Sequence, residues 1–153
     1  MPIMLEMVLR LLLAAALGAV IGYQRERAGK QAGLRTHILI SSGAALITLV
    51  SIYGFGGVSD PARVAAGVVV GVGFLGAGVI LHREGGMVAG LTTAATIWVM
   101  AGVGLAAGAG LYVVAAVATA IVLGVLIIPR WTRMNLNKNI LKRLKEGNED
   151  EPG

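Results

Sequence analysis

The chain has 153 residues, of which 56% are apolar and 14% charged, with a formal net charge of +5 and no cysteine. A soluble domain carries about 25% charged residues, so a water-facing surface is excluded. Disulfides and thiolate metal sites are excluded as well. The basic residues lack the interleaved aromatics of a nucleic-acid-binding surface, so the lipid bilayer is the expected partner and nucleic acid is not.

Five apolar segments approach the roughly 20 residues that a helix needs to cross a bilayer. In chain order, the predicted spans cover residues 3–23, 36–53, 63–81, 91–107 and 111–128. These segments predict an all-α transmembrane domain over residues 1–130, built from five helices rich in glycine. Residues 131–153 are predicted to form a cytoplasmic tail that is first basic and then acidic.

The distribution of basic residues predicts how the chain lies in the membrane. Eleven of the 13 Lys and Arg residues follow the first span, the third span or the fifth span. Because Lys and Arg are retained on the cytoplasmic side, the N-terminus is expected outside and the C-terminus inside. Arg10 and Arg63 fall toward the outer side, and Arg10 is expected to pair with Glu6 four residues away.

The chain carries signs of an internal repeat. The tripeptide Leu-Gly-Ala at 17–19 recurs at 75–77, and Arg25-Glu26 recurs as Arg83-Glu84, both at an offset of 58 residues. The hypothesis is that spans one and two form a helical hairpin, which spans three and four repeat in parallel about an axis along the membrane normal.

Glycine spacing indicates helix packing. Small residues four apart let helix backbones approach closely. The predicted packing positions are Gly18 and Gly22 in the first span and Gly67, Gly71 and Gly78 in the third. A second interpretation of the third span is a helix that can break and line a substrate cavity.

Charged and hydroxyl residues gather at two predicted cytoplasmic corners. The first holds Arg25, Glu26, Arg35, Thr36 and His37, and the second holds Arg83, Glu84, Thr92 and Thr93. Each corner includes a helix N-terminus, whose free N–H groups attract anions. The corners are predicted to bind an anionic group or a loop of a partner. The alternative is that their charges only anchor the chain to lipid headgroups.

At the outer side, Asp60 is predicted to cap the third span, with Pro61 at its first position and Arg63 within pairing distance. The alternative is an outer-face cation site at Asp60 and Arg63. No carboxylate lies mid-span, and no arrangement of Ser, His and Asp suits catalysis. We therefore expect no enzyme activity, assign no metal site, and predict no cofactor unless Mg²⁺ is a ligand or substrate.

Several blocks of sequence carry a family resemblance. They are GAVIG at 18–22, AGLRTH at 32–37, DPARVAA at 60–66, GFLGAG at 73–78 and GLTTAATIW at 90–98. The sequence resembles the MgtC/SapB family of bacterial inner-membrane proteins over most of residues 18–110. The resemblance implies five membrane helices, a periplasmic N-terminus, and a link to growth in low magnesium and, in pathogens, to survival inside host cells.

Two positions depart from the family pattern. Family members often have Glu where this chain has Gln24 and Gln where it has Gly67, so an ion-binding role of those positions is in doubt. Many members also carry a cytoplasmic ligand-binding-like domain after the last helix, which is not expected here.

Two functions are consistent with these observations. The favoured one is a regulator in magnesium homeostasis, acting through helix contacts with another membrane protein or with a second copy in a homo-oligomer, for which a dimer is the guess. The alternative is a direct transporter or channel for Mg²⁺ or another small solute.

Overall fold

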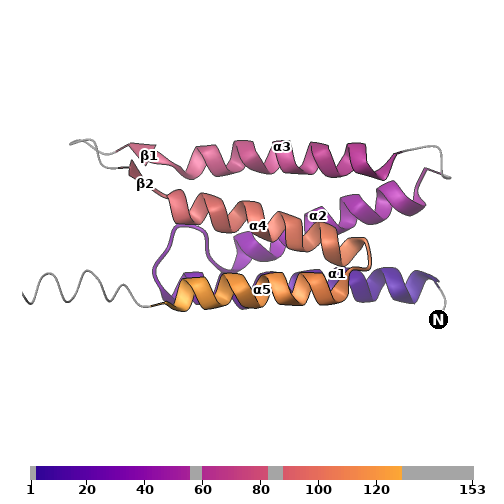
Figure 1. The fold of residues 1–153 in the computed structure, drawn as a ribbon, viewed down its shortest axis with the longest axis horizontal. Coiled ribbons are helices and arrows are strands. Elements are labelled where there is room, and N and C mark those ends of the chain that lie inside the picture. The colour runs from indigo at the N-terminus through magenta and orange to yellow at the C-terminus, as the bar shows by residue number, and fades with distance from the viewer. Residues whose placement is uncertain (1–2, 56–59, 83–87, 129–153) are drawn as a thin grey trace, which may run out of the picture. The chain divides into compact units, whose positions relative to one another are not determined.

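The computed structural model describes residues 3–55, 60–82 and 88–128, which form five helices (Figure 1). The helices are α1 (Ile3–Arg27), α2 (Leu34–Tyr53), α3 (Pro61–Val79), α4 (Leu91–Gly108) and α5 (Tyr112–Ile127). Helices α1 to α4 are long and apolar enough to cross a membrane, and α5 is apolar but shorter. The predicted all-α fold of five helices is thus confirmed. The described residues up to 123 form one compact unit, and after it the structure describes only 124–128.

The helix boundaries follow from local chemistry. Asp60 caps α3 as predicted, because its carboxylate accepts a hydrogen bond from the Ala62 N–H at 2.9 Å, with Pro61 at the first helical position. Before α4, Gly90 has φ +95°, a left-handed conformation that suits glycine. Between α3 and α4 lies a short antiparallel ribbon of β1 (Leu81–His82) and β2 (Val88–Ala89), which was not predicted.

The core of the first unit lies between α1, α2 and α4, and α3 packs against α4 and α2. Its fully buried apolar side chains are mostly small, as at Ala14, Ala45 and Ala107. Glycines bring the backbones together: a Cβ added to Gly18 would lie 2.6 Å from the His37 carbonyl oxygen, and one added to Gly22 would lie 2.7 Å from the Leu34 Cα. The first-span glycines therefore lie at close helix contacts.

The third-span glycines lie differently from the prediction. A Cβ added to Gly67, Gly71 or Gly78 would meet no atom within 4 Å. Helix α3 instead contacts its neighbours through Val68, which packs in a cluster with residues of α2 and α4, and through Gly76. Within the described chain, Gly67, Gly71 and Gly78 thus form no close helix contact.

The repeat hypothesis remains a prediction. Helix α1 packs against α2, and α3 packs against α4, as two hairpins would. The hairpin connections differ, however: residues 28–33 contain a turn, whereas the second connection contains the β1–β2 ribbon. Gly33 before α2 is extended, while Gly90 before α4 is left-handed. Arg83 and Glu84 lie outside the described residues.

Candidate functional site at the Arg25 end of the bundle

Helix α1 ends where α2 and α4 begin, and we call this the Arg25 end. Arg25 is only 3% exposed, and its guanidinium Nη2 donates a hydrogen bond to the Thr93 hydroxyl of α4. Thr96, also buried, donates its hydroxyl hydrogen to the Thr93 carbonyl oxygen at 2.8 Å. The structure thus joins one residue from each predicted corner, 68 positions apart in the chain.

Glu26 caps the start of α2 at this end. Its Oε2 accepts a hydrogen bond at 2.9 Å from the N–H of Leu34, which is the first residue of α2. A carboxylate at this position also complements the helix dipole. Gly33 leaves room for it, since a Cβ there would lie 2.7 Å from the same oxygen. The predicted anion-binding helix start at α2 is therefore occupied by the chain's own carboxylate.

His37 lies inside the bundle and is 0% exposed. Its Nδ1 lies 2.9 Å from the Gly33 carbonyl oxygen. A carbonyl oxygen can only accept, so we assign the ring hydrogen to Nδ1. Arg25 also acts on this ring electrostatically. The buried cluster at the Arg25 end therefore consists of Arg25, His37, Thr93 and Thr96, drawn from three helices.

The other predicted site residues lie outside this cluster. Arg35 and Thr92 are exposed, and Thr36 is half-buried on α2. Asp60 and Arg63 are exposed at the start of α3, where Asp60 serves as the helix cap. The described residues contain no group of three or more His, Cys, Asp or Glu side chains that could hold a metal ion.

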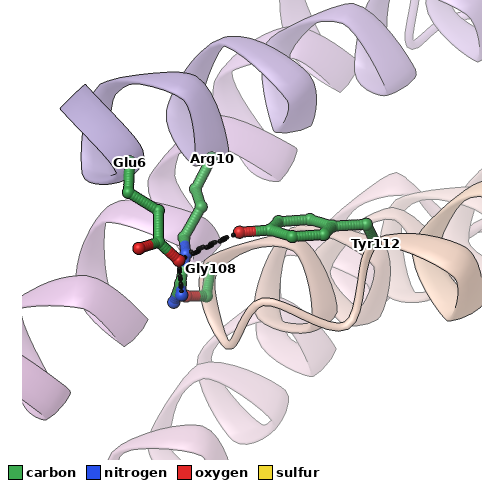
Figure 2. Close-up of polar contacts among 4 residues, drawn as sticks. All are labelled: Glu6, Arg10, Gly108 and Tyr112. Carbon is green, nitrogen blue, oxygen red and sulfur yellow. Dashed lines mark hydrogen bonds and ion pairs between the residues drawn. The ribbon is translucent and has the colours of Figure 1, made fainter. Parts of the chain in front are cut away.

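A second polar cluster surrounds Arg10, where the start of α1 meets the end of α4 and the start of α5 (Figure 2). Arg10 is 9% exposed; its Nε donates to the Tyr112 hydroxyl at 3.1 Å and its Nη1 to the Gly108 carbonyl oxygen at 2.8 Å. Its Nη2 pairs with Glu6, which confirms that predicted pair. Its Cζ also lies 6.0 Å from the centre of the Tyr53 ring.

The role of Arg10 across helices was missed at the sequence level. The available signal was an arginine within a largely apolar segment, which in a membrane requires a partner inside the protein. The structure supplies partners from the end of α4 and the start of α5. Arg10 therefore links the start of α1 to the α4–α5 connection through hydrogen bonds.

Replacing Arg10 should loosen this connection. Arg10→Met keeps the aliphatic length but leaves the Gly108 carbonyl without its guanidinium donor, which should cost about 2 kcal/mol. We expect a lower melting temperature in detergent, measured by size-exclusion chromatography after heating. Arg63→Met, at an exposed arginine, is the control and should melt as the parent does. Equal melting of both variants would contradict the assigned role.

Comparisons with known proteins add to this geometry. The MgtC family matches residues 11–134 of the chain. YhiD of Escherichia coli K12, which carries the provisional name of a magnesium transporter, is 46% identical over 94% of this chain and 71% of its own length. Protein MgtC of Salmonella typhimurium LT2 is 44% identical over 89% of this chain and 58% of its own length. No solved structure is significantly similar.

Proposed function

Because the chain belongs to the MgtC family, we propose that it is a regulator in magnesium homeostasis that binds a transmembrane helix of another membrane protein. It is a multi-pass protein of a bacterial inner membrane. The name of YhiD supports the link to magnesium. The proposal assigns that link to regulation through helix contacts, and not to conduction of Mg²⁺ by the chain itself.

The observation that carries this proposal is an apolar groove between α2 and α3. Its volume is about 620 Å³, and it is lined by Leu39, Ile40, Gly43, Ala44, Ile47, Val64, Gly67, Val68, Gly71, Val72 and Leu75. The lining comes from two helices that are apolar enough to span the membrane. Its occupant must therefore be apolar.

The glycines of the groove favour a helix as that occupant. Gly43, Gly67 and Gly71 would each accept a Cβ without meeting an atom within 4 Å. Helices associate in lipid through surfaces of small residues, where two backbones can approach. Gly18 and Gly22 already allow the backbones of α1 and α2 to pack closely. The groove offers the same kind of surface to a helix from outside the chain.

Filling the groove tests the proposal. Gly71→Leu places a side chain in the groove, and nothing lies within 4 Å of the new Cβ. We expect loss of growth support at low magnesium, with normal expression and melting temperature. Gly73→Leu is the matched control, because Gly73 is equally free of neighbours but does not line the groove. If both variants support growth as the parent does, helix binding in the groove is wrong.

A crosslinking experiment can identify the occupant of the groove independently of the growth test. A photoreactive amino acid placed at Gly67 should crosslink to another membrane protein and yield a new band. A band at twice the mass of the chain would instead identify a second copy as the occupant. Crosslinks to lipid alone would contradict the proposal.

Transport of Mg²⁺ is the second candidate, and buried polar side chains within the spans favour it. His37, Thr93 and Thr96 lie inside membrane helices, where polar groups often mark a path for a solute. The electrostatics oppose it, since Arg25 places a buried positive charge beside these groups. A divalent cation would be repelled at that point. Regulation is therefore the better-supported function.

The orientation in the membrane is part of the proposal. We infer an outer N-terminus and an inner C-terminus from the distribution of basic residues. A fluorescent protein fused after Trp131 should fold and fluoresce in the cytoplasm, and alkaline phosphatase at the same position should be inactive. Phosphatase activity without fluorescence would reverse the orientation.

A further inference from the structure

Two polar side chains of α2 are fully buried without a hydrogen-bond partner for one of their atoms among the described residues. They are His37, at Nε2, and Ser41, at Oγ, and both residues are 0% exposed. They lie four positions apart, on one face of the helix and about 6 Å apart along it. Buried polar atoms are nearly always hydrogen-bonded in folded proteins, so each of these atoms calls for a partner.

Ser41 differs from other hydroxyl residues in the helices. Ser42 donates its hydroxyl hydrogen to the Ile38 carbonyl oxygen, Thr48 to that of Ala44, and Thr119 to that of Ala115. This bond to the preceding turn satisfies a hydroxyl within its own helix. Ser41 makes no such bond in the described chain. Its hydroxyl is therefore available to a group outside α2.

The chemistry of His37 restricts what that group can be. With the ring hydrogen on Nδ1, facing Gly33, a neutral ring carries a lone pair on Nε2 and can only accept there. The partner must then donate a hydrogen bond. A cation is opposed by Arg25, which acts electrostatically on this ring. A neutral group that can both donate and accept satisfies Nε2 and the Ser41 hydroxyl together.

We propose that His37 Nε2 and Ser41 Oγ bind ordered water, and that they form the inner end of a hydrated polar file that begins at Arg25 and Thr93. Water donates to the ring nitrogen and accepts from the hydroxyl, and a buried water usually makes about three hydrogen bonds. Thr96, one turn after Thr93 on α4, is also buried, with its hydroxyl bonded to the Thr93 carbonyl. The file runs between α1, α2 and α4, which pack against one another.

We place the inner end of the file at Ser41. Beyond Ser41, α2 and α4 are in backbone contact: a Cβ on Gly104 would overlap the Ser41 carbonyl oxygen, and one on Gly108 would lie 2.8 Å from the Ala45 carbonyl oxygen. At the far end, Arg10 bonds to the last residue of α4. The close contact of α2 and α4 beyond Ser41 therefore makes Ser41 the inner end of the proposed file.

Solid-state NMR of the full chain in lipid bilayers tests this proposal. The chain has two histidines, so a His82→Gln variant labelled with ¹⁵N-histidine reports on His37 alone. We expect an unprotonated Nε2 and rapid transfer of magnetisation from water protons to the ring. Ser41→Ala should lose most of this transfer, whereas Ser42→Ala, at the serine bonded to Ile38, should retain it.

Three results would overturn the proposal. The first is a ring that receives no magnetisation from water, which would show a dry interior. The second is a protonated Nε2, which would make the ring a donor and remove the reason for a donating partner. The third is an equal loss of transfer in Ser41→Ala and Ser42→Ala, which would place the water elsewhere.

Discussion

Gly104→Ala is expected to disrupt the bundle, although it adds a single methyl group. The new Cβ would lie 2.9 Å from the Ala44 Cβ and closer still to the Ser41 carbonyl oxygen. A backbone oxygen cannot move aside as a side chain can, so α4 would have to separate from α2. Overpacking of this kind costs about 3 kcal/mol or more. We expect little monodisperse protein after extraction and a strongly lowered melting temperature.

Gly102→Ala supplies the matched control on the same helix. Gly102 is exposed, and an added Cβ would meet nothing within 4 Å. Alanine has a higher helix propensity than glycine by up to about 1 kcal/mol, so stability should be unchanged or slightly raised. The two variants thus carry the same chemical change with opposite expected signs. Equal melting temperatures would show that α2 and α4 do not touch at Gly104.

Arg25→Lys is expected to abolish function, whereas Arg35→Lys is expected to retain it. Both changes keep the positive charge, but Arg25 is buried and bonded to Thr93, while Arg35 is exposed. A lysine ammonium lacks the planar fork of a guanidinium and loses its bonding geometry at such a site. The measurement is growth at low magnesium in a strain that depends on the chain.

Thr93→Val provides a second test of the same contact. It removes the hydroxyl that accepts from Arg25 while keeping the side-chain shape, and should match Arg25→Lys in growth and in melting temperature. If Arg25→Lys and Arg35→Lys both support full growth, the basic residues act only by charge. Anchoring to lipid headgroups would then be the better account of the Arg25 end.

The helices of this chain could be predicted from sequence because membrane spans are marked by uninterrupted apolar length. The start of α3 was predictable for a local reason, since Asp60 and Pro61 form a cap within adjacent positions. The Glu6–Arg10 pair was predictable from helical spacing alone. Each of these features is fixed by residues close together in the chain.

The glycine contacts could be predicted only in part: Gly18 and Gly22 pack closely as predicted, but the same spacing occurs on faces that pack and on faces that do not. Gly104 and Gly108 are four apart and lie against α2, while Gly67 and Gly71 are four apart and have no close neighbour. The rotation of each helix about its axis decides between these outcomes. That rotation depends on all the contacts of the helix, which spacing within one helix does not report.

The candidate site was predicted in part. Arg25, His37 and Thr93 were selected as corner residues, and the structure buries all three at the Arg25 end. Because these residues are far apart in the chain, the contact of Arg25 with Thr93 and the full burial of His37 could not be predicted. Arg35 and Thr92, selected on the same grounds, are exposed. Burial here depends on which face of α2 and α4 meets α1, and the sequence pattern does not specify it.

We propose that the chain regulates through helix contacts and does not itself conduct Mg²⁺. The most direct test is Mg²⁺ entry into liposomes that contain a Mg²⁺-sensitive dye and the purified full chain. Vesicles with a known magnesium channel serve as the positive control, and protein-free vesicles as the baseline. We predict entry at the baseline rate for the folded, monodisperse chain. Entry that rises in proportion to the amount of chain, and is lost in Gly104→Ala, would contradict the claim.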